Sequence, residues 1–195
     1  LKPHGGIVMW RTFVYNPEID KDRMKRSYLE FMPLDGLFDD NVILQTKNGP
    51  LDFQPSEPIQ PLFGAMRRSQ MMLELQITQE YTGHSTYLVY LLPMWRTVLD
   101  FDTCCLGPGS TVARITEAKI YPQRLRAIAG VATTGTVRHS TDHSFAQATW
   151  YSFGRLAWNP DAPTGPTTPD PLRHTLPTDH TQHTSRSTTP APTCT

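Results

Sequence analysis

Apolar runs of strand length recur along most of the chain, separated by turn residues. They are rich in β-branched and aromatic side chains, which favour extended structure. We predict strands over residues 6–15, 41–46, 71–80 and 127–132. Asn16-Pro17 comes at the end of the first strand and Asn48-Gly49-Pro50 soon after the second, which is typical of a chain that turns there.

Helical patterns occupy the stretches between these runs. Residues 19–32 combine a charged face with apolar positions at helical spacing, and Pro33 ends the pattern. A second helix is predicted within residues 85–99, interrupted near Pro93, and a last one over residues 145–158. The first strands begin roughly 30 to 35 residues apart, which is the rhythm of successive βα units.

This rhythm predicts an α/β fold with a parallel sheet whose faces are covered. A closed barrel and an open doubly wound sheet share the rhythm, so spacing alone leaves both open. No Gly-x-Gly-x-x-Gly follows any predicted strand, which disfavours a nucleotide-binding open sheet.

The composition changes sharply after Trp158. Residues 159–195 are mostly Pro, Thr, Ser and His, and they hold too little apolar surface to offset the entropy of ordering. We therefore predict a folded part over residues 1–158 and a disordered tail over residues 159–195, either a linker or a stretch without a selected role.

The chain has the features of a piece of a larger protein. A complete eight-fold barrel needs about 250 residues, and this chain has 195. It starts at Leu1 with neither an initiator Met nor a signal-peptide layout. We expect it to begin inside a longer protein, and cytoplasmic and secreted locations both stay open.

Charge and motif content exclude several classes of function. The formal net charge of +0 predicts no nucleic-acid partner, and no apolar run approaches the roughly 20 residues of a membrane span. No Gly-x-Ser-x-Gly is present, which disfavours a serine hydrolase. His139 and His143 have metal-like spacing on a helix, but the surrounding residues indicate a loop. We expect no metal and no cofactor.

Charged side chains gather at the predicted strand ends. Arg11 follows the apolar run of the first strand, Lys47 follows the second, Asp52 comes just after the next turn and Glu80 closes the third. In a parallel barrel the carboxyl ends of the strands carry the active site. Two carboxylates and two cations suit hydrolysis of a sugar that is itself negatively charged.

Each of these charges also has a structural interpretation. A charge at a strand end is often a solvated loop residue. Arg11 lies inside an apolar run, and an internal Asp or Glu could be its partner without any catalysis.

At these same residues the sequence resembles the xylan-debranching α-glucuronidases, glycoside hydrolase family 67. The resemblance runs through nearly all of residues 3–158, and two of its blocks are highly specific in combination. These blocks are Lys47-Asn48-Gly49-Pro50-Leu51-Asp52-Phe53-Gln54 and Gln76-Ile77-Thr78-Gln79-Glu80-Tyr81. Further matching blocks are Gly5-Gly6-Ile7-Val8-Met9-Trp10-Arg11, Pro33-Leu34-Asp35-Gly36 and Phe153-Gly154-Arg155-Leu156-Ala157-Trp158.

The resemblance implies the C-terminal part of a (β/α)8 TIM barrel, with residues 1–158 as a partial catalytic domain. It implies an inverting hydrolase that releases (4-O-methyl)-D-glucuronic acid from the α-1,2-linked side groups of xylo-oligosaccharides, in the degradation of xylan. Asp52 and Glu80 match the carboxylate pair that serves the attacking water, and Arg11 and Lys47 match cations near the uronic acid carboxylate. The general acid of the family lies upstream of Leu1, so the chain alone is expected to be inactive.

Three hypotheses remain at this point. The first is an enzyme of this family whose partner is a glucuronic-acid-substituted xylo-oligosaccharide, with a homodimer as a candidate assembly of the full-length enzyme. The second is a non-catalytic carbohydrate-binding or inactive remnant. The third, an unrelated α/β domain whose strand-end charges are structural, is disfavoured by the matching blocks.

Overall fold

The computed structural model describes residues 1–14, 16, 18, 21–50, 57–77, 89–136, 143 and 145–164. Within these residues it contains a parallel sheet with the strand order β1-β2-β3-β4. The strands are β1 (Val8–Arg11), β2 (Val42–Lys47), β3 (Gln70–Gln76) and β4 (Ile128–Val131). The predicted strand positions and the parallel sheet are confirmed, and each strand lies beside the one that precedes it in the chain.

The first strand is shorter than predicted. Its last ladder hydrogen bond runs from the Thr12 N–H to the Gln45 carbonyl at 3.0 Å, and Phe13 and Val14 have left the sheet. β2 itself continues to Lys47, but the Thr12 carbonyl accepts a hydrogen bond from Ser27 Oγ of the following helix, so the chain leaves the sheet there. The predicted end of the third strand, residues 78–80, lies outside the described residues.

Side chains of the sheet divide into an apolar and a polar face. Leu44, Leu73 and Leu75 are fully buried in the main hydrophobic core. Lys47 and Glu74 sit directly opposite each other in the β2–β3 register, at positions that alternate with those leucines. Because successive side chains of a strand point to opposite faces, the charged residues line the face away from this core.

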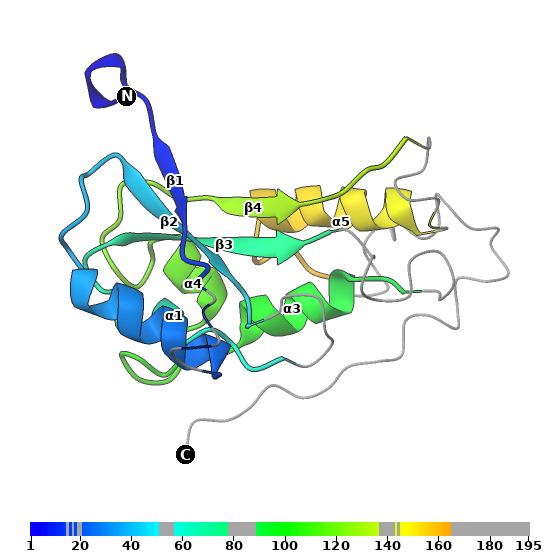
Figure 1. Ribbon diagram of the computed structural model, residues 1–195. Coiled ribbons are helices and arrows are strands. Elements are labelled where there is room, and N and C mark those ends of the chain that lie inside the picture. Colours follow the sequence, from blue (N-terminus) through cyan, green and yellow to red (C-terminus); the bar gives the residue numbers. More distant parts are fainter. Residues whose placement is uncertain are drawn as a thin grey trace, which may run out of the picture.

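The described helices all contribute to the core on the apolar face. They are α1 (Arg23–Phe31), α2 (Leu62–Ala65), α3 (Leu92–Asp100), α4 (Val112–Thr116) and α5 (Ala146–Trp158), with short 3-10 turns at Lys2–His4 and Met32–Leu34. Their contributions to the core cluster include Phe31, Phe63, Trp95, Ile115 and Leu156. Figure 1 shows α1, α3 and α4 together on one side of β3, and α5 running alongside β4. Helices from successive crossovers therefore pack on the same face of the sheet.

Pro93 begins a helix rather than interrupting one. It lies in the first turn of α3, which starts at Leu92 and continues to Asp100. Backbone N–H groups in the first turn of a helix have no acceptor within the helix, so the absence of an N–H in proline costs nothing there. The fixed φ of proline also suits the start of a helix. The described part of the predicted helix therefore starts at Leu92, and residues 85–88, where the pattern was predicted to begin, lie outside the described residues.

The packed part of the chain extends past Trp158, where the folded part was predicted to end. Arg96 Nη1 donates to the Pro160 carbonyl, and Lys119 Nζ lies 2.9 Å from an Asp161 carboxylate oxygen. Ala162 is only 6% exposed. A cation on α3 and another after α4 thus hold the segment that follows α5, which composition alone did not indicate. Residues 165–195 lie outside the described residues.

Asp35, in one of the blocks that resemble family 67, has a structural role. Its carboxylate accepts hydrogen bonds from the backbone N–H groups of Arg67, Arg68 and Ser69, and the bond from Ser69 is 2.8 Å long. Burial alone would raise the pKa of Asp35, but these hydrogen bonds outweigh it and hold the pKa below its usual value. The ionised carboxylate therefore ties the loop before β2 to the start of β3.

Gly130 in β4 offers a test of how closely α5 packs on the sheet. A Cβ at this position would meet the Ile77 side chain and lie 2.7 Å from the Phe153 ring. We expect Gly130→Ala to lower the free energy of unfolding by about 1–3 kcal/mol through overpacking. Gly154 within α5 has no heavy atom within 4 Å of such a Cβ, so Gly154→Ala is expected to stabilise by roughly 0.5–1 kcal/mol. Urea unfolding of both variants measures the contrast, and equal effects of the two would contradict the packing.

Candidate functional site

The two basic residues predicted for the site end neighbouring strands. Arg11 is the last residue of β1 and Lys47 the last of β2. Because β1 and β2 are parallel, their carboxyl ends meet at the same edge of the sheet. The structure therefore brings these two cations to one edge of the sheet. Asp52 and Glu80, the predicted carboxylate pair, lie outside the described residues.

Arg11 is paired with a carboxylate that the sequence analysis did not single out. Its Nε donates to Glu74 Oε2 at 2.9 Å, and its Nη2 donates to Glu74 Oε1 at 2.6 Å. The Glu74 side chain is fully buried, whereas half of the Arg11 side chain is exposed. An internal acidic partner was the structural interpretation of Arg11, and Glu74 is that partner. The sequence feature that could have identified this partner is a single acidic residue between apolar ones, in Leu73-Glu74-Leu75.

Gln45 on the intervening strand completes this group. Its side-chain amide donates to Glu74 Oε2, the same oxygen that accepts from Arg11 Nε. Gln45 lies directly opposite Arg11 in the β1–β2 register. Side chains from β1, β2 and β3 are thus joined across the polar face of the sheet. The positive charge of Arg11 and the hydrogen bonds from Arg11 and Gln45 offset the free-energy cost of burying the Glu74 carboxylate.

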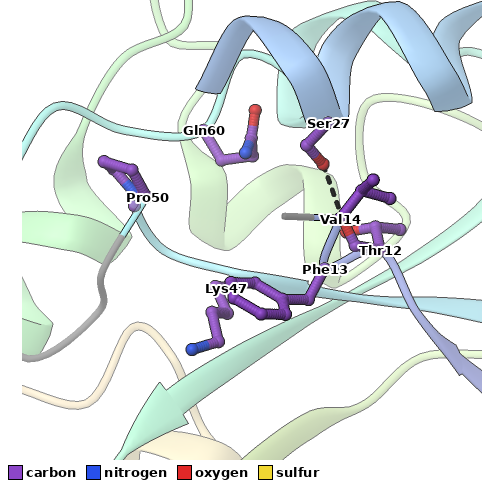
Figure 2. A pocket seen from close by; sticks show the side chains of 8 residues that line it. Thr12, Phe13, Val14, Ser27, Lys47, Pro50 and Gln60 are labelled. Carbon is purple, nitrogen blue, oxygen red and sulfur yellow. Dashed lines mark hydrogen bonds between the residues drawn. The ribbon is translucent and has the colours of Figure 1, made fainter. Parts of the chain in front are cut away.

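Lys47 borders a small pocket between the ends of β1 and β2 and helix α1. Its lining residues are Thr12, Phe13, Val14, Ser27, Lys47, Gly49, Pro50 and Gln60. Lys47 Nζ lies 4.6 Å from the centroid of the Phe13 ring, an attractive arrangement for a cation. Figure 2 shows the Phe13 ring against Lys47, and the hydrogen bond from Ser27 Oγ to the Thr12 carbonyl at 2.6 Å. That bond fixes α1 against the end of β1.

The arrangement suits an anionic ligand with an apolar surface. Two basic side chains stand at one edge of the sheet, one with a planar fork of donors and the other a point charge next to an aromatic ring. Among the described residues no three His, Cys, Asp or Glu side chains come together in a way that could hold a metal ion. No helix in the described part of the chain is long and apolar enough to cross a membrane.

Sequential parallel strands, helices packed on one face and basic residues at the carboxyl edge define an α/β protein with a polar strand-end site. Residues 1–139 match the middle domain of glycosyl hydrolase family 67, and the chain belongs to this family. The resemblance found in the sequence blocks is thereby confirmed.

The relatives carry a consistent name. The chain is 44% identical over 165 residues to a probable alpha-glucuronidase A of Aspergillus flavus, a match that covers 82% of the chain and 20% of the relative. It is 43% identical over 169 residues to the alpha-glucuronidase A of Emericella nidulans, covering 83% and 20%. It is 42% identical over 166 residues to an alpha-glucuronidase of Hypocrea jecorina, also covering 83% and 20%. The chain thus spans about a fifth of the length of these relatives.

Proposed function

We propose that the protein to which this chain belongs is an α-glucuronidase. Its substrates are xylo-oligosaccharides, from which it releases (4-O-methyl)-D-glucuronic acid by hydrolysing the α-1,2 link to xylose. The observation that carries the proposal is the pair of cations, Arg11 and Lys47, at one edge of the sheet in a family 67 chain whose relatives bear this name. Cations at a strand-end site match a sugar that bears a carboxylate.

The residues divide the reaction between them. Arg11 and Lys47 bind the uronic acid carboxylate and so orient the sugar ring. Asp52 and Glu80 act on the water: one accepts its proton while the other holds it in line with the anomeric carbon. The water attacks from the face opposite the leaving xylose, which inverts the configuration. A general acid outside this chain protonates the leaving oxygen.

The same proposal assigns residues 1–158 to the C-terminal part of a (β/α)8 barrel. Two features of the sheet support it. Its strands follow the chain order without a switch, and the described helices all contribute to the core on one face. A doubly wound sheet carries helices on both faces and reverses its strand order, whereas a barrel wall has helices outside and polar strand ends inside.

An enzyme completed with the flanking parts of the Hypocrea jecorina relative tests this function. We expect it to release (4-O-methyl)glucuronic acid from substituted xylo-oligosaccharides. Proton NMR during the first turnovers should show the β-anomer of the released sugar before it equilibrates. The α-anomer as first product would contradict inversion. If the completed enzyme binds the oligosaccharide without releasing any uronic acid, the non-catalytic hypothesis is the correct one.

A further inference from the structure

Glu74 is a buried carboxylate in an apolar stretch of β3. Its side chain is fully buried, and its neighbours Leu73 and Leu75 belong to the hydrophobic core on the other face. A buried charge of this kind is costly unless it is compensated by an opposite charge and hydrogen bonds. The compensation here comes from Arg11 and Gln45, two strands and one strand away.

The pairing fixes the direction of the Arg11 guanidinium. Glu74 engages the edge formed by Nε and Nη2, with both bonds within 2.9 Å. Since Nε is attached to the side-chain stem, a two-point contact on this edge sets the plane of the group as well as its position. The edge formed by Nη1 and Nη2 then faces away from Glu74. A planar carboxylate that binds Arg11 at two points beside Glu74 would use that edge.

Arg11 and Glu74 differ in how far their side chains are exposed to solvent. The Arg11 side chain is half exposed, while the Glu74 side chain has no exposed surface. A ligand at the strand ends therefore has access to Arg11 and none to Glu74. Gln45 in turn holds Glu74 through the oxygen shared with Arg11 Nε.

We propose that Glu74 is a positioning residue, braced by Gln45, that aims Arg11 at the carboxylate of the uronic acid. The inference rests on the proposed function for the ligand, but the pairing itself is a property of the chain. Two measurements therefore separate the two claims.

The first measurement follows the arginine Nε–H signals of the complete 195-residue chain by NMR. Arg11 is identified by the signal that disappears in Arg11→Lys. We expect its Nε–H to exchange slowly with water, and Glu74→Gln to speed the exchange about tenfold or more, because a charge-assisted acceptor is lost. Glu30→Gln is the matched control. Glu30 pairs with Arg26 on α1, so this variant should change the Arg26 signal and leave Arg11 unchanged.

The second measurement uses the completed enzyme and two inhibitors, D-glucuronic acid and D-glucose. Glu74→Gln is expected to raise the inhibition constant of D-glucuronic acid about tenfold, the loss that corresponds to about 1.4 kcal/mol. The inhibition constant of D-glucose should stay within a factor of two or so, because it has no carboxylate for Arg11 to meet. A purely structural defect would weaken both sugars together.

Each outcome is decisive. Unchanged Arg11 exchange in Glu74→Gln, or equal losses for the two sugars, overturns the positioning role. If Arg11→Ala leaves D-glucuronic acid binding intact, the proposed function of Arg11 fails, whatever the exchange data show. If Glu74→Gln does not fold, Gln45→Met provides the test, because it keeps the charges of both Arg11 and Glu74. It should change Arg11 exchange and the inhibition constant of D-glucuronic acid in the same direction but by less. No change in either quantity would overturn the proposal.

Discussion

Replacing the catalytic base with alanine is expected to lower kcat of the completed enzyme by several orders of magnitude while KM changes little. Asp52 and Glu80 are the two candidates, and the interaction lost belongs to the transition state rather than to substrate binding. The two variants should differ, because the proposed mechanism has one carboxylate take the proton while the other only holds the water. Steady-state kinetics of Asp52→Ala and Glu80→Ala measure this difference.

Azide provides a check on the assignment of the base. It is a small nucleophile that needs no proton removed, so it should restore turnover in the variant that lacks the base and yield a β-linked sugar azide. Glu30→Ala, on the exposed side of α1, is the control and should leave kcat unchanged. Near-normal kcat in both Asp52→Ala and Glu80→Ala would refute the assignment.

Removal of the Lys47 charge is expected to raise KM for the uronic acid substrate by about 30- to 100-fold, with a smaller effect on kcat. Lys47 is half-buried beside Phe13, where a charge interacts more strongly than in open solvent. An attraction of roughly 2–3 kcal/mol is reasonable for such a partly shielded pair. The substitution Lys47→Met keeps an unbranched apolar side chain at this position and removes the ammonium group, with its charge and its contact to the Phe13 ring.

Salt dependence separates this effect from a change of shape. The native enzyme should bind its charged sugar less tightly as ionic strength rises, and Lys47→Met should show a weaker dependence. Lys2→Met is the control, because the exposed Lys2 pairs with Asp40 just before β2, at the amino end of the strands rather than at their carboxyl edge. Equal salt dependence in native enzyme and Lys47→Met would show that Lys47 does not meet the substrate carboxylate.

The strands and the basic edge of the site could be predicted because each depends on local sequence. The run of Val42 to Lys47 has the composition of a strand and ends in a charge, and the parallel order then places that charge at the edge. The short helices α2 and α4 were not predicted. Stretches of four and five residues are too short to show a helical period.

The partner of Arg11 could not be derived in the same way. Glu74 lies 63 residues further along the chain, and the contact depends on the register of three strands. A shift of one residue in the β2–β3 pairing would turn Glu74 toward the leucine core, and the same shift of β1 against β2 would turn Arg11 to the opposite face from Glu74. Sequence pattern predicts that a buried Arg needs an acid, but the choice among the acids of the chain is made by strand register.

The contact that joins Arg11, Gln45 and Glu74 also constrains how this part of the family can change over evolutionary time. Loss of Arg11 alone would leave the buried Glu74 without its counter-charge, and loss of Glu74 alone would leave Arg11 without its anchor. Neither single step is neutral, so descendants that abandon the pair should do so at both positions, with Gln45 free to become apolar afterwards. Positions 11, 45 and 74 should therefore covary among homologues although they belong to separate strands.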